Sequence, residues 1–135
     1  MNNEHEMSSH ENYLKNCIKE KLEEIEKENQ TIQNTQQQLD KTILEYNKQQ
    51  LSLEQEQITI KHQHEEQGVK PTQAKEKAKL ETQPEQRKQI SYEAHVTELK
   101  REVEVLKRKQ KLSYVELDFL MIQYQEIVGG CNCSG

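Results

Sequence analysis

The sequence predicts an all-α protein in which two long helices form a coiled coil and are broken by a Gly/Pro-containing hinge. Three observations predict this fold. The 135-residue chain is only 31% hydrophobic and 32% charged, whereas globular domains are about 45–50% apolar. Its apolar residues nevertheless recur with a seven-residue period in two segments. The four Gly and two Pro residues lie between those segments and at the C-terminal end.

The first segment, residues 12–65, is expected to be an acidic coiled-coil helix. A stripe of large side chains occupies every seventh position: Ile18, Ile25, Ile32, Leu39, Tyr46, Leu53 and Ile60. The residues four positions later are more apolar than those three positions later, so we assign the stripe to heptad position d. Position a then includes Leu22, Asn29 and Ile43. Asn29 is expected to fix the register, because a buried amide needs a matching partner; a loose, wet seam is the alternative.

A further apolar stripe in this segment lies outside the seam. Leu44, Leu51 and Ile58 each come two residues before a member of the d stripe. Two residues turn a helix by about 200°, so these side chains lie on the far side. We therefore expect the helix to contact two neighbours over residues 39–60.

Residues 66–91 are predicted to form the hinge, because the heptad pattern stops there and Gly68, Pro71 and Pro84 interrupt the chain. A short polar helix over residues 72–81 is compatible with this composition. Residues 1–11, before the heptads begin, are expected to be disordered.

The second coiled-coil helix is predicted over residues 92–128, where steps of four and three residues alternate. Its seam begins with Tyr92, Val96, Leu99, Val103 and Leu106. The pattern lapses at Gln110 and Ser113 and then resumes. Val at position a with Leu at position d favours parallel dimers.

The end of this helix, residues 112–128, is apolar on nearly every face and is predicted to dock onto a partner, because so large an exposed patch is rare on a monomer. The expected partner-binding residues are Leu112, Val115, Leu117, Phe119, Leu120, Met121, Ile122, Tyr124 and Ile127. Residues 129–135 are expected to be a flexible tail that contains Cys131 and Cys133.

The charge distribution leaves two architectures open. Residues 1–66 carry seven Lys and fourteen Asp or Glu, whereas residues 75–111 carry eleven Lys or Arg and seven Glu. This asymmetry favours an antiparallel hairpin or bundle, with the acidic helix folded onto the basic one. The heptad residues favour a parallel dimer, and we lean slightly towards helices that oligomerise. Solvated helix faces would also explain both charge runs.

The sequence shows no signature of catalysis, so we expect no enzyme, no cofactor and no metal site. His62 and His64 lie two residues apart, on different faces of a helix, and cannot share one ion. Cys131 and Cys133 alone cannot complete a tetrahedral metal site. An odd number of cysteines and an N-terminus without signal-peptide features favour a reducing, intracellular location, and no stretch is apolar enough to span a membrane.

Together these features predict a non-enzymatic structural or adaptor subunit of an intracellular assembly. Its partners would be copies of itself, other coiled-coil proteins, or both. We expect a cytoplasmic location, with the cytoskeleton (cilium or centrosome) as a natural setting and the nucleus as an alternative. A second hypothesis is a nucleic-acid or chromosome-associated factor that uses the basic face of residues 100–111, although we expect nucleic acid less than protein. A third is a helper that holds client chains as prefoldin does; the break lacks prefoldin's strands, so no kinship is inferred.

Overall fold

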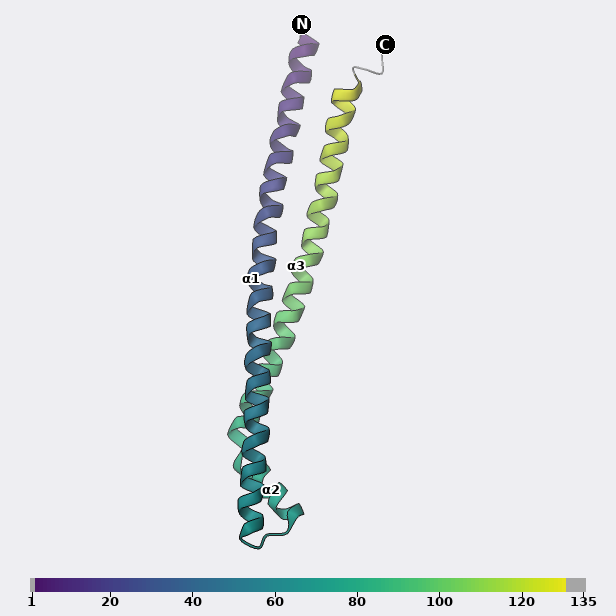
Figure 1. Cartoon of the computed structure of the whole chain (residues 1–135). Helices are drawn as coiled ribbons and strands as arrows, with labels where there is room; N and C mark the ends of the chain where they lie inside the picture. Colours follow the sequence, from purple (N-terminus) through teal and green to yellow (C-terminus); the bar gives the residue numbers. More distant parts are fainter. Residues whose placement is uncertain (1, 131–135) are drawn as a thin grey trace. The chain divides into compact units, whose positions relative to one another are not determined.

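The computed structural model describes residues 2–130, which form three helices and contain no strand (Figure 1). Helix α1 spans Asn2–Glu66, α2 spans Pro71–Glu81 and α3 spans Gln83–Gly130. The prediction of an all-α protein in which one long helix packs on another is confirmed. Residues 131–135, with Cys131 and Cys133, lie outside the described residues.

The helices contribute to two compact units. Unit 1 combines Met1–Asn34 with Val103–Gly135, and unit 2 is Thr35–Glu102. Within unit 1, α1 and α3 run in opposite directions, because Tyr124 contacts Glu11 whereas Glu116 contacts Lys21.

Unit 2 has the same antiparallel arrangement of α1 and α3, with α2 added. Ile43 and Tyr46 of α1 line a groove with Val96 of α3. Further along α1, Gln57 bonds to Thr82, immediately before α3 begins. Unit 1 is therefore built from two stretches of chain that are distant in sequence, whereas unit 2 is one continuous stretch that folds back on itself.

Helix α1 is long because residues 2–66 contain neither Gly nor Pro. It includes residues 2–11, which we expected to be disordered; helix-compatible residues there extend the helix beyond the heptads. The helix ends at Glu66, and Gly68 follows two residues later with a φ of 94°, which favours glycine. The Val69 amide donates to the His64 carbonyl at 3.0 Å and the Gly68 amide to the Glu65 carbonyl at 3.0 Å, as in a Schellman motif.

Thr82 separates α2 from α3 and is fully buried. Its hydroxyl donates to the Ala78 carbonyl at 2.8 Å and accepts from the side-chain amides of Gln57 at 3.1 Å and Gln86 at 3.2 Å. Helix α3 begins at Gln83, not at Tyr92 as the heptads indicated. Pro84 lies in its first turn, where its missing amide hydrogen costs no helical hydrogen bond. That this connection acts as a hinge remains a prediction.

Each unit contains buried apolar residues. In unit 1 these are Leu14 and Ile25 of α1 and Val103 and Leu117 of α3. Unit 2 buries a mixture of large and small side chains: Leu39, Leu99, Ala74, Ala78, Thr35, Thr42 and Thr82. The alanines let the backbone of α2 approach its neighbours closely. No helix within residues 2–130 is both long and apolar enough to cross a membrane.

Candidate partner-binding face

The predicted seam of α3 matches the pattern of burial along the helix. All its members are buried or half-buried: Tyr92, Val96, Leu99, Val103, Leu106, Gln110, Ser113, Leu117, Leu120, Tyr124 and Ile127. Gln110 and Ser113, where the apolar pattern lapses, keep their places in this series. The sequence therefore identified the side of α3 that is covered.

The α1 stripe is likewise covered along its length, because Ile18, Ile25, Ile32, Leu39, Tyr46, Leu53 and Ile60 are all buried or half-buried. Of the residues assigned to position a, Asn29 and Ile43 are half-buried. Leu22 differs from the expectation, because it is 51% exposed. The neighbouring Lys21 is more covered, with only 17% of its side chain exposed.

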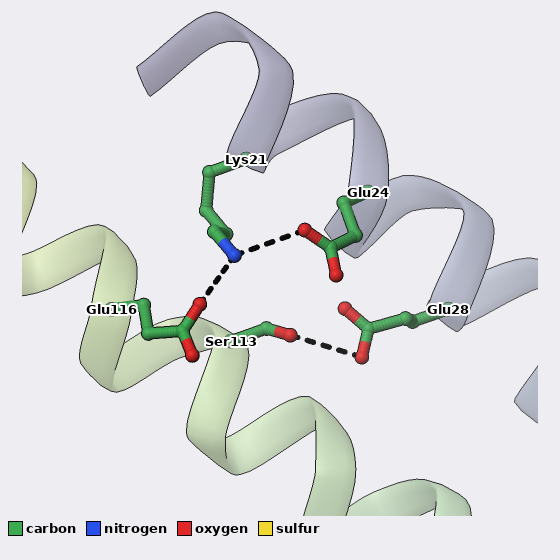
Figure 2. Close-up of polar contacts among 5 residues, drawn as sticks. All are labelled: Lys21, Glu24, Glu28, Ser113 and Glu116. Carbon is green, nitrogen blue, oxygen red and sulfur yellow. Dashed lines mark hydrogen bonds and ion pairs between the residues drawn. The ribbon is translucent and has the colours of Figure 1, made fainter. Parts of the chain in front are cut away.

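Lys21 takes the place expected for Leu22 because its charge is paired across the seam of unit 1. Its ammonium group donates to Glu116 of α3 and, at 2.9 Å, to Glu24 of α1 (Figure 2). The hydrogen bond to Glu116 is the main cause, followed by that to Glu24, of a Lys21 pKa raised above its ordinary value. The aliphatic stem of a lysine can cover apolar surface while its ammonium group binds carboxylates.

The polar interruptions of the two heptad series meet in unit 1. The Gln110 side-chain amide donates to the Asn29 side-chain carbonyl. One turn further along α3, the Ser113 hydroxyl donates to Glu28 at 3.0 Å (Figure 2). A shift of one helix along the other would separate these groups and place amides against leucine or isoleucine. The partner expected for Asn29 is therefore Gln110 of the same chain.

The nine residues predicted to bind partners differ in exposure. Leu117 is buried, and Leu120, Tyr124 and Ile127 are half-buried, within unit 1. The other five are exposed: Leu112 by 65%, Val115 by 63%, Phe119 by 61%, Ile122 by 54% and Met121 by 43%. We call Leu112, Val115, Phe119 and Ile122 the outer face. Each follows a member of the covered seam by two residues, a rotation of about 200°.

Lys15 lies close to the covered part of this segment. Its ammonium group is 5.9 Å from the centre of the Tyr124 ring and 3.5 Å from Glu11. Tyr124 and then Glu11 raise the Lys15 pKa, and the Tyr124 hydroxyl also contacts Glu11 at 3.3 Å. The contacts of Lys15 and Glu11 with Tyr124 hold the seam of α3 against α1 and leave the outer face uncovered.

A second apolar stripe is exposed on α1 within unit 2. Leu44, Leu51 and Ile58 are between 56% and 61% exposed. Ile58 lines a groove with Ala78 of α2. A second neighbour that covers Leu44 and Leu51 remains a prediction.

The residues considered for chemistry are dispersed. Within residues 2–130, no group of three His, Cys, Asp or Glu side chains is placed to hold a metal ion. His62 is exposed, whereas His64 contacts Glu81 at 3.1 Å. The basic side chains of residues 107–111 are exposed, as a solvated helix face requires.

No protein family, curated protein or solved structure matches this chain.

Proposed function

We propose that this protein is a non-enzymatic structural or adaptor subunit of an intracellular assembly. It binds helical partners through the outer face of α3. The observation that carries this proposal is the exposure of Leu112, Val115, Phe119 and Ile122 on a helix whose opposite face is already covered by α1. These side chains cannot all serve the folding of the chain on itself.

The energetic scale supports a binding role. Burial of a large apolar side chain contributes about 1.5–3 kcal/mol relative to exposure. Four such side chains on one preformed helix can therefore contribute several kcal/mol to association. A helix laid in a groove with anchors at three- and four-residue steps is a common way of using such a face.

The broader setting rests on the sequence alone. Long helices with heptad repeats and a low overall apolar content are typical of coiled-coil scaffolds. We therefore propose first a cytoplasmic, cytoskeletal assembly at the cilium or centrosome. The role of the α1–α3 seam as a coiled coil belongs to the same proposal.

Size-exclusion chromatography of cell extracts tests the function. The wild-type chain is expected in assemblies much larger than its 16.0 kDa. The double variant Phe119→Glu, Ile122→Glu is expected to leave these assemblies and to elute at a low apparent molecular mass. Ile90→Glu is the matched control, because Ile90 is 66% exposed on the same helix but lies outside the outer face. Retention of the double variant in the large assemblies would exclude the outer face as the docking surface.

A second candidate function is that of a client-holding helper, because the same exposed apolar side chains could contact unfolded chains. This function predicts that the purified protein suppresses the aggregation of a heat-denatured client and that Phe119→Glu abolishes the suppression. An adaptor that binds folded helices predicts no suppression.

A further inference from the structure

The outer face has the spacing of a second heptad seam. Leu112 and Phe119 are seven residues apart, as are Val115 and Ile122, and the two pairs interleave by steps of three and four. Position a of this second frame is therefore occupied by Leu112 and Phe119, and position d by Val115 and Ile122. All four are more than half exposed within unit 1.

The charged residues that flank this frame are arranged in complementary pairs. The preceding a position of this frame is Val105, and position g, immediately before each a position, holds Glu104, Lys111 and Asp118. Position e, immediately after each d residue, holds Lys109, Glu116 and Gln123. In parallel two-stranded coils, position g of one helix lies beside position e of the next heptad on the other helix.

We propose that the occupant of the outer face is a second copy of this chain, with the two α3 helices parallel and in register. This inference rests on the proposed function, since it identifies the partner of the same docking surface. In this arrangement Glu104 of one copy lies beside Lys109 of the other, and Lys111 lies beside Glu116. Symmetry repeats each pair, so the interface gains four attractive pairs and juxtaposes no like charges at g and e.

An antiparallel pair of outer faces would be repelled by its own charges. Its apolar layers would match Leu112 with Ile122 and Val115 with Phe119 of the other copy. Asp118 would then lie beside Asp118, and Glu116 beside Glu116, near the centre of the interface. The charge sequence therefore selects the parallel orientation.

The hairpin fold of unit 1 makes so short an interface sufficient. Four apolar layers would not stabilise two isolated helices in water, because helix formation itself is costly. Here α1 already holds α3 in its helical conformation through the inner seam. Association then orders few additional residues, and preorganisation of this kind increases affinity. Arg108 occupies the next d position and ends the apolar stripe towards the N-terminus of α3.

Sedimentation equilibrium of the full chain over a range of concentrations tests the occupant. The wild type is expected to reach twice its monomer mass. Phe119→Glu is expected to remain monomeric with unchanged helicity by circular dichroism, whereas Ile90→Glu is expected to dimerise like the wild type. A wild-type chain that stays monomeric at the highest concentration, or a Phe119→Glu variant that dimerises normally, would overturn the proposal.

Charge reversal tests the orientation. Within residues 2–130, Glu104 and Lys109 are exposed and have no side-chain partner in the same chain. Glu104→Lys or Lys109→Glu alone is expected to weaken the dimer on the order of tenfold, because two pairs become repulsive, and the double swap is expected to restore it. Additive weakening by the double swap would contradict the parallel register.

Cysteine cross-linking gives an independent readout of register. After Cys17→Ser, Cys131→Ser and Cys133→Ser, a single Val115→Cys is expected to form a disulfide between copies, because equivalent residues face each other only in the parallel pair. A cross-link obtained only from Val115→Cys mixed with Phe119→Cys would show an antiparallel pair and overturn the proposal.

The outcomes also separate this inference from the function on which it rests. If the purified chain is monomeric but outer-face variants leave the cellular assembly, the partner is a different helical protein. The self-association proposal then fails and the proposed function stands. If the chain is monomeric and the variants stay in the assembly, both fail.

Discussion

The contact between Asn29 and Gln110 predicts a specific pattern of stability changes. Replacing either residue by Leu leaves the other amide half-buried without its partner in the seam. An unsatisfied buried polar group costs about 1–3 kcal/mol. Because water still reaches a half-buried amide, we expect Asn29→Leu and Gln110→Leu each to lower the free energy of unfolding by about 1 kcal/mol.

The double variant should behave differently from the sum of the single variants. Asn29→Leu with Gln110→Leu removes both polar groups and brings two apolar side chains into contact, which is near neutral or stabilising. We therefore expect a favourable coupling energy of about 2 kcal/mol in a double-mutant cycle. Urea unfolding followed by circular dichroism measures each corner of the cycle.

Gln30→Leu is the matched control for this cycle. Gln30 is exposed, and its side-chain amide donates to the Asn34 side-chain carbonyl along α1, at 3.4 Å. Its replacement should change stability by less than about 0.5 kcal/mol. Single variants as stable as the wild type, together with an additive double variant, would refute the idea that matched amides specify the register of unit 1.

Three further predictions concern other parts of the two units. Leu99→Ala should cost about 2–5 kcal/mol in urea unfolding, because Leu99 is buried in unit 2, whereas Leu80→Ala at a 63% exposed site should cost far less; equal losses would contradict the assigned core. Gln89→Leu should stabilise the protein by about 1 kcal/mol, because both polar side-chain atoms of Gln89 are buried without a partner among the described residues; a loss of stability would contradict this reasoning. The folded-state pKa of Lys21 is raised above 10.5, so its contribution is complete below that pH and lost as pH rises through the raised value. The stability difference between wild type and Lys21→Met should therefore shrink only above pH 10.5, and a difference that already disappears near neutral pH would contradict the assignment.

Hydrophobic periodicity was sufficient to predict the covered face of α3 and one side of the seam on α1. It could not predict which residues occupy the other core position of the α1 seam, because polar residues are covered there with their polar groups hydrogen-bonded. Lys21 pairs with carboxylates, and the Thr42 hydroxyl donates to the Gln38 carbonyl at 2.7 Å within α1. Thr42 is therefore buried although its hydropathy disfavoured it. Hydropathy alone assigned Leu22 to position a of the seam, but Leu22 is exposed.

The sequence also contains an indication of the antiparallel register, in the spacing of its polar interruptions from the turn. Asn29 precedes Gly68 by 39 residues, and Gln110 follows Pro71 by 39 residues. Polar interruptions placed symmetrically about a turn would meet in a hairpin. The start of α3 had no such signal, since Pro84 is compatible with either a break or the first turn of a helix.

The central claim is that α1 folds back on α3 within a single chain. Its most direct test is a disulfide between Asn29→Cys and Gln110→Cys after the three native cysteines are replaced by Ser. We predict a bond within one chain, seen as a faster-migrating monomer on non-reducing gels that reverts on reduction. Cross-links formed only between chains, or none at all, would contradict the fold on which both proposals depend.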